Sequence, residues 1–221
     1  MKPIKSIIAI VVITFLMMGY SMQKPFTEGV LQYDITILSA KNEPTTLNSL
    51  NGAVHTLYLK QDASRTEMKS ALGTESTVYN AGAGSGFILK EYSGQKLMIT
   101  LNAANWAQKN QANNSLKFSI SNEEITIGTY KCKKATATMA DGKLYTVYYD
   151  PSLVIANKSY NNAFANLPGL PVQYEIKSGN LTFKYTLKSI SAEGVPSQKF
   201  DAPKTGFRVM SYEENQQLKK G

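Results

Sequence analysis

A strict alternation of apolar and polar residues over 172–188 constrains the fold of this chain more than any other feature. The apolar members are separated by single polar residues, and a Ser-Gly-Asn turn divides the run into two arms. A period of two is typical of a β-strand with one buried and one solvated face, and two such arms around a glycine-containing turn indicate a hairpin. The apolar positions are Val172, Tyr174, Ile176, Leu181, Phe183, Tyr185 and Leu187.

A turn with two prolines precedes this hairpin, at Leu167-Pro168-Gly169-Leu170-Pro171. Each proline fixes its own φ, and Gly169 between them can adopt the positive φ that a tight turn needs. Leu167 and Leu170 are apolar in a turn, where polar residues are usual. We therefore expect both leucines to point into the body of the protein.

Similar β-rich runs cover most of the remaining chain and predict a long antiparallel sheet. A length of 221 residues, with 43% hydrophobic and 18% charged residues, favours a single globular domain. Arg65 and Glu67 share one face of their run, which we expect to be the solvent side. Gly128 is interpreted as a bulge, and Asp141-Gly142 indicates a hairpin turn. The runs span residues 29–39, 53–60, 64–71, 74–80, 86–91, 95–100, 114–121, 125–139, 143–149 and 197–202.

Helical patterns are few and short. Residues 102–113 lack β alternation and predict a helix with Asn102 as its N-cap and Trp106, the only tryptophan, on its apolar side. Trp106 either covers the open end of the sheet or belongs to a movable lid over a cavity. Residues 159–165 predict one helical turn, and the polar residues from about 211 onward predict a terminal helix or tail.

The N-terminus has the pattern of a signal peptide at residues 1–21. Lys2 and Lys5 precede an apolar stretch at 7–18 that is short for a membrane span, and small residues place the cleavage after Ser21. We expect a single β-rich domain over residues 22–221 that is exported, soluble, and periplasmic or secreted. An uncleaved membrane anchor is the alternative.

The positive charge of the chain does not indicate nucleic-acid binding. The formal net charge is +8, and loss of Lys2 and Lys5 with the leader lowers it to 8 − 2 = +6. Lysines alternate with apolar residues along the predicted strands, which favours a solvated face. Anionic lipid headgroups or an acidic protein partner remain the alternative, and with them peripheral contact with a membrane.

The sequence offers little for catalysis. His55 and Cys132 are the only histidine and the only cysteine, so the usual multi-histidine and multi-cysteine metal sites are excluded, and we expect both residues to be packed. Glu123 and Glu124 are adjacent, and neighbours on a strand point to opposite faces. We therefore predict no enzyme activity, no catalytic residue, no metal and no cofactor.

The turn at residues 166–171 also carries a family resemblance. Leu167-Pro168-Gly169-Leu170 resembles the motif of the GLPGLI-type secreted proteins of Bacteroidetes, a family of unknown function, with Asn166 and Pro171 at its first and last positions. The resemblance implies a remote likeness to LolA-like lipoprotein carriers, and hence a curved, incompletely closed β-barrel. Further similar segments are Tyr130-Lys131-Cys132-Lys133-Lys134, Val147-Tyr148-Tyr149, Phe200-x-x-Pro203 and Phe207-x-Val209-Met210.

These observations together predict a mainly β protein, with one or two short helices against the concave face of the sheet. A curved sheet of this length either fills its concave face with side chains or leaves a cavity. We predict a carrier of a hydrophobic ligand, such as a lipid or a lipoprotein acyl chain, in the cell envelope. The alternative is a plugged scaffold that acts as an accessory protein of an envelope complex. The residues predicted to line the cavity are Trp106, Leu167, Leu170, Tyr174 and Phe183.

Overall fold

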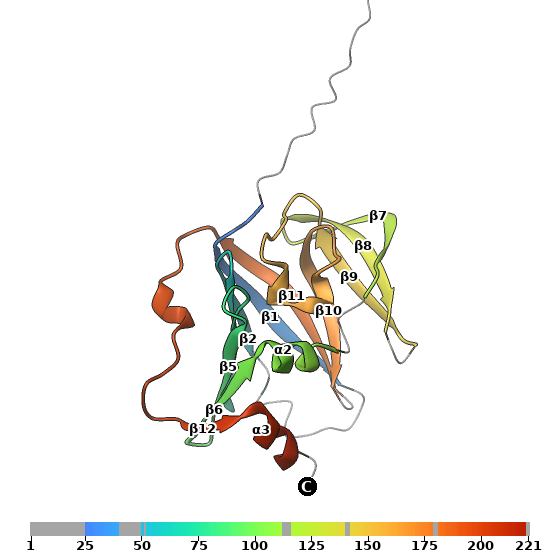
Figure 1. Ribbon diagram of the computed structural model, residues 1–221. Helices are drawn as coiled ribbons and strands as arrows, with labels where there is room; N and C mark the ends of the chain where they lie inside the picture. The colour runs from blue at the N-terminus through green and yellow to red at the C-terminus, as the bar shows by residue number, and fades with distance from the viewer. Residues whose placement is uncertain are drawn as a thin grey trace, which may run out of the picture.

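The chain folds around one curved β-sheet of twelve strands (Figure 1). The computed structural model describes residues 25–39, 50, 52–111, 116–139, 142–178 and 181–219. The signal peptide predicted at residues 1–21 lies outside the described residues. The strands are β1 (Gly29–Ser39), β2 (Val54–Leu59), β3 (Ala63–Ser70), β4 (Gly73–Asn80), β5 (Ser85–Tyr92), β6 (Gln95–Asn102), β7 (Ser119–Ile127), β8 (Tyr130–Thr138), β9 (Leu144–Asp150), β10 (Leu170–Ser178), β11 (Leu181–Ser191) and β12 (Arg208–Ser211).

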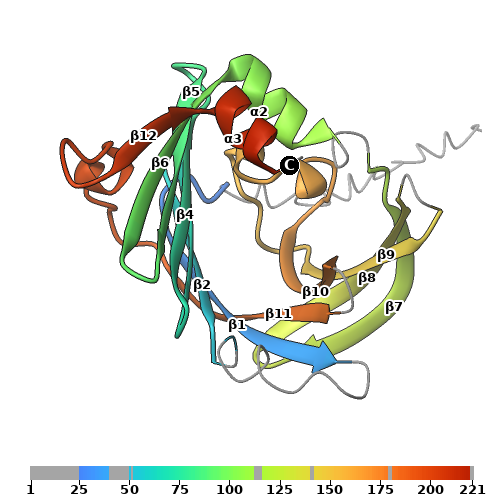
Figure 2. The same ribbon diagram turned by 90° about the horizontal axis from the view of Figure 1, so that it is seen from below.

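Strand β1 lies at the centre of the sheet and joins its two halves. The order is β12-β6-β5-β4-β3-β2-β1-β11-β10-β9-β8-β7, so β1 pairs with β2 on one side and with β11 on the other. Strands β2 to β6 and β7 to β11 are two successions of antiparallel neighbours. Short turns join most of these neighbours, as is typical of antiparallel strands, whereas residues 151–169 join β9 to β10. The sheet curls without closing, which confirms the predicted mainly β class (Figure 2).

Two details of the predicted strands are wrong. Residues 197–202 form no strand: Ser197–Phe200 is the 3-10 helix η4, and the last strand, β12, pairs in parallel with β6. Gly128 is not a bulge within one strand over 125–139: it lies, with a φ of +58°, in the turn that divides this run between β7 and β8. A parallel pairing with a strand more than a hundred residues earlier leaves no local sequence pattern.

The remaining elements are short helices. Helix α2 (Ala103–Lys109) begins as predicted at Asn102, whose side chain accepts a hydrogen bond from the Asn105 backbone N–H, while the Asn105 side chain accepts one from the Asn102 backbone N–H. This capping box satisfies two amides of the first turn. The 3-10 helices η2 (Lys158–Tyr160) and η3 (Asn162–Phe164) lie where one helical turn was predicted. Helix α3 (Tyr212–Leu218) follows β12.

Buried side chains gather in three clusters. The main core contains residues of strands β1, β2, β8, β9, β10 and β11. Residues of η2, of η3 and of the turn that contains Leu167 pack in the same cluster. The lateral cluster holds α2 and α3 against β4 to β6 on the inner side of the sheet (Figure 2). The outer cluster lies on the opposite face, where Phe200 and Phe207 pack against β4 and β5. The lateral cluster consists of Tyr79, Ile88, Ile99, Leu101, Trp106, Met210 and Tyr212.

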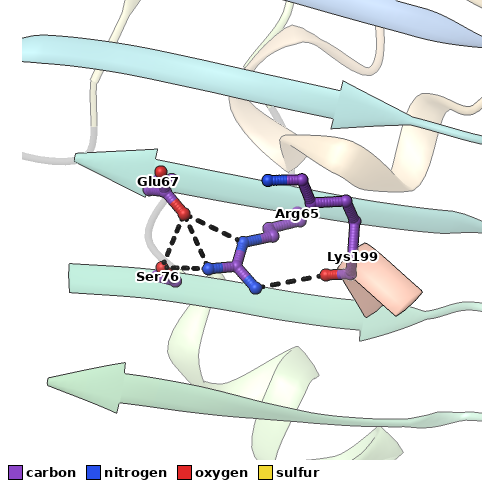
Figure 3. A network of polar contacts seen from close by, with 4 residues as sticks. All are labelled: Arg65, Glu67, Ser76 and Lys199. Carbon is purple, nitrogen blue, oxygen red and sulfur yellow. Dashed lines mark hydrogen bonds and ion pairs between the residues drawn. The ribbon is translucent and has the colours of Figure 1, made fainter. Parts of the chain in front are cut away.

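A strap, defined as residues 192–207 between β11 and β12, covers part of the outer face. It corrects the prediction that Arg65 and Glu67 face solvent. Their side chains are only 16% and 21% exposed, and an Arg65 Nη2 to Glu67 Oε2 distance of 2.6 Å joins them. Arg65 also donates to the Ser76 hydroxyl and to the backbone carbonyl of Lys199 in the strap (Figure 3). The ion pair therefore lies under a segment that is remote in sequence.

The turn before β10 confirms one prediction and corrects another. Leu167 and Leu170 are almost completely buried in the main core, as expected. Gly169 does not adopt positive φ. It is required for a different reason: a Cβ at this position would lie 2.3 Å from the Asp150 carbonyl oxygen and 2.6 Å from Cδ2 of Tyr149. The glycine allows the turn to approach the backbone of β9 closely.

Candidate ligand-binding cavity

The five residues predicted to line a cavity separate into two groups. Leu167, Leu170, Tyr174 and Phe183 belong to or pack against the main core, whereas Trp106 belongs to the lateral cluster. The fold therefore brings four of them together and places the fifth elsewhere. Of the five, only Tyr174 lines the cavity of about 630 Å³ that lies between β9 and β10.

Trp106 is held in a stack. Its ring lies on the ring of Tyr79, with centroids 4.1 Å apart and an angle of 5° between the planes. The Lys109 ammonium lies 5.6 Å from the centroid of the same ring, within the range of a cation–π interaction. The structure places Trp106 over the inner face of β4 to β6 and outside the lining of the cavity described below.

Aromatic side chains fill much of the inner face beside β10 and β11. Phe164 of η3 meets the Tyr174 ring edge-on at 4.8 Å, and Tyr174 stacks on Tyr185 at 4.8 Å with 4° between the planes. The Tyr33 hydroxyl donates a 2.8 Å hydrogen bond to the carbonyl of Pro171. Burial raises the pKa of Tyr33 and Tyr174 far above the usual value, so both phenols stay neutral. The centre of the inner face is thus packed.

Strands β9 and β10 leave this packed region and then separate. Their pairing runs from Leu170 opposite Asp150 to Tyr174 opposite Val147, and it is irregular after Pro171. Proline has no N–H to donate, which accounts for a break in the ladder at that point.

Beyond Tyr174 the two strands keep only their outer neighbours. Strand β10 continues along β11 to Ser178, and β9 continues along β8 to Leu144. Within residues 142–178 no pairing joins the first half of β9 to the second half of β10. Figure 1 shows the start of β9 and the end of β10 apart. The sheet is therefore open between these strands.

A cavity of about 630 Å³ lies at this opening. Its volume is in the range typical of small-molecule sites. Tyr145 and Tyr174 line it from the buried face of the strands, and Thr146 and Gln173, their neighbours in sequence, line it as well. Since successive residues of a strand point to opposite faces, the lining includes residues of both faces of the sheet beside the opening. Its lining is Leu116, Met139, Lys143, Leu144, Tyr145, Thr146, Tyr148, Asn161, Ala163, Gln173, Tyr174, Glu175, Ile176 and Lys177.

The two ends of the cavity differ in chemistry. Its inner wall consists of the buried residues Leu116, Tyr145, Ala163 and Tyr174. Its rim consists of exposed residues on both strands, of which Leu144 is 73% exposed. An apolar wall with an open rim can accept an apolar group from the surface and remove it from water. The rim residues are Lys143, Leu144, Glu175, Ile176 and Lys177.

The sequence signal for this cavity was weak. Tyr145 and Ile176 were recognised as members of alternating strands, but alternation does not tell which neighbouring strands separate. Leu116 and Ala163 come from segments that reach the opening only through tertiary packing. The one local signal is that Leu144 and Tyr145 are adjacent apolar residues, which interrupts the alternation at the start of a strand.

His55 and Cys132 are packed, as the sequence predicts, and neither lines the cavity. The His55 ring lies 5.5 Å from that of Tyr185, and burial lowers the pKa of its imidazole to about 4. Cys132 is buried, and burial raises the pKa of its thiol to about 11. Over the part of the chain that the structure describes, no three histidine, cysteine or acidic side chains come together as a metal site.

Comparison with known proteins identifies relatives of the fold alone. No family model matches the chain, and no curated protein matches it. An uncharacterised conserved protein from Thermus thermophilus is similar in structure, with a TM-score of 0.50 and 9% identity over 84% of this chain and 91% of that one. At this identity the likeness extends to the fold and no further.

Two other solved structures are similar at lower scores. PNGF-II in the P21 space group has a TM-score of 0.48 and 13% identity over 87% of this chain and 33% of that one, so this chain spans about a third of its length. The LolA superfamily protein NE2245 from Nitrosomonas europaea has a TM-score of 0.42 and 9% identity, over 81% of this chain and 92% of that one.

In the described residues, no helix is both long and apolar enough to cross a bilayer.

Proposed function

We propose that this protein is an exported, non-enzymatic carrier that binds a hydrophobic ligand in the cavity between β9 and β10. The observation that carries the proposal is the cavity itself: about 630 Å³, with a buried apolar and aromatic wall and an exposed rim. Each methylene group removed from water in such a site contributes about 0.8 kcal/mol. Partial insertion of a lipid acyl chain would therefore give measurable binding.

The roles of the predicted residues change in this proposal. Tyr174 contacts the ligand, together with Leu116, Tyr145 and Ala163 of the inner wall. Leu167, Leu170 and Phe183 support the main core and so hold the wall in place. Trp106 has no part in binding, since it lies in the lateral cluster.

The export of the protein is proposed from its sequence. The leader at residues 1–21 and the resemblance of the Leu167–Leu170 turn to GLPGLI-type secreted proteins both favour the periplasm or the outside of the cell. The N-terminal sequence of the protein recovered from that compartment should begin at Met22. An intact leader in a carbonate-resistant membrane pellet would contradict export as a soluble protein.

A fluorescent reporter at the rim tests ligand binding directly. We would replace Trp106 by Phe and introduce Leu144→Trp, so that the only indole lies at the cavity. Titration with twelve-carbon amphiphiles should shift its emission saturably, and the melting temperature should rise with ligand concentration. The matched control carries Leu72→Trp in the same background, because Leu72 is also exposed but lies in the turn between β3 and β4.

A second variant tests whether the cavity is the site. Ala163→Leu places a larger apolar group at the inner wall, and it should reduce binding while the protein stays folded. Native mass spectrometry of the unmodified protein should reveal a co-purified lipid. If the unmodified protein binds no amphiphile and no lipid co-purifies with it, the carrier function is excluded. The filled inner face would then favour the plugged scaffold, and a protein partner should be sought.

A further inference from the structure

The rim of the cavity carries charge of mainly one sign. Lys143 precedes β9 and Lys177 lies near the end of β10, so each side of the opening contributes one ammonium group. Glu175 is the acidic member of the rim. It stands opposite Lys184 in the register of β10 and β11, and directly opposed strand residues lie within reach of each other's charge. The rim therefore carries two ammonium groups and one carboxylate, a net charge of +1.

The segment of the chain that forms the cavity, residues 116–188, is positive as well. Residues 116–188 contain nine lysines and five acidic residues, a net charge of +4. The remainder of residues 25–221 contains twelve basic and eleven acidic residues, a net charge of +1. The excess positive charge of the folded chain thus lies mostly in the segment that contains β7 to β11. A field of this sign raises the local concentration of anions.

Several acidic groups of this segment are already engaged. Glu123 pairs with Lys134 at 3.0 Å, and Glu124 pairs with Lys133 at 3.6 Å. Asp150 is buried and accepts hydrogen bonds from the backbone amide and hydroxyl of Ser152. These carboxylates do not lie at the rim, so they leave its positive character in place.

We propose that the ligand is an amphiphile with an anionic head, and that Lys143 and Lys177 bind this head while Leu116, Tyr145 and Tyr174 contact the chain. The inference rests on the proposed carrier function and adds the chemical class of its ligand. The head is a carboxylate or a phosphate, because both accept hydrogen bonds from an ammonium group. The apolar wall and basic rim match the two ends of such a molecule.

Calorimetric titration with four amphiphiles of equal chain length tests the head group. Dodecanoate and dodecyl phosphate should bind about tenfold more tightly than uncharged dodecanol or cationic dodecyltrimethylammonium, because a hydrogen bond between an ammonium group and an anion is stronger than one to a neutral group. The relative affinity of the two anions distinguishes a carboxylate ligand from a phosphate ligand. Equal affinity for dodecanoate and dodecanol would overturn the anionic head and leave the carrier standing.

Variants of the rim test the two lysines. Lys143→Gln/Lys177→Gln should weaken dodecanoate binding about tenfold and leave dodecanol binding unchanged, whereas Glu175→Gln should strengthen dodecanoate binding. The control Lys131→Gln/Lys188→Gln removes the same charge from exposed positions outside the cavity lining and should have less than about a twofold effect. An equal loss in both double variants would overturn the site, because it would show attraction by the general surface charge. Binding of none of the four amphiphiles would reject the carrier itself.

Discussion

Gly169 packs so closely against Asp150 that a Cβ on the glycine would lie 2.3 Å from the aspartate carbonyl oxygen. The contact joins the turn before β10 to the last residue of β9, where these two strands are still paired. It is adjacent to Leu170 and Leu167, which are buried in the main core. The same contact lies at the paired end of the two strands, which stay together as far as Tyr174 and Val147 and separate toward the cavity beyond that point.

Gly169→Ala should destabilise the protein by about 1–3 kcal/mol, because a backbone atom stands where the methyl group would lie and one of the strands must move. The change is measured by urea denaturation, with one m-value fitted to the variant and the unmodified protein together. Gly82→Ala is the matched control: its added Cβ would meet nothing closer than 3.4 Å, and we expect a change below about 0.5 kcal/mol. Equal midpoints for Gly169→Ala and the unmodified protein would show that the turn can withdraw from β9.

Trp106→Ala should cost about 3–5 kcal/mol, since the substitution removes the ring that stacks on Tyr79 and opens a void in the lateral cluster. Trp106→Phe should cost less, because a phenyl ring keeps part of the stack. Thermal unfolding of both variants provides the measurement. In the unmodified protein, the Trp106 emission should stay constant while an amphiphile binds. A saturable shift would contradict the placement of the ligand between β9 and β10.

Glu67→Gln should destabilise by about 1–3 kcal/mol, because it leaves the largely buried Arg65 guanidinium without its counter-charge. Glu91→Gln is the control, since Glu91 and Lys96 form an ion pair of similar length, 2.7 Å, whose side chains are 36% and 51% exposed. Exposed pairs contribute little, so this change should stay below about 1 kcal/mol. Similar denaturation midpoints for the two variants would mean that the strap does not shield Arg65 from water.

His55 should make the stability depend on pH. Burial lowers its pKa to about 4 from an ordinary 6.5, so between these values the unfolded chain binds a proton that the folded protein does not. The contribution of His55 to the free energy of unfolding should therefore be fully present above pH 6.5. It should be lost as the pH decreases from about 6.5 to about 4, by at most about 3 kcal/mol. The measurement is the difference from His55→Phe at several pH values. His55 is the only histidine, so a pH-independent difference would refute its burial as a neutral group.

Local patterns were sufficient to predict most strands and one helix. The alternation of residues 172–188 corresponds to β10 and β11, paired as a hairpin with Ile176 opposite Phe183. Asn102 is the N-cap of α2 as predicted. These features depend on neighbours a few residues apart, namely the period of a strand and the hydrogen bonds of a first helical turn.

What the sequence alone determined was therefore which residues face inward along each strand and where the chain turns. The tertiary structure alone decided what each face meets. Arg65 lies under the strap because Lys199 comes from 134 residues later, Gly169 is needed because β9 passes beside it, and Trp106 lies apart from Tyr174 because the two halves of the sheet carry separate clusters. The opening between β9 and β10 arises where two strands each keep only one neighbour, and alternation within a strand is the same with one neighbour or two.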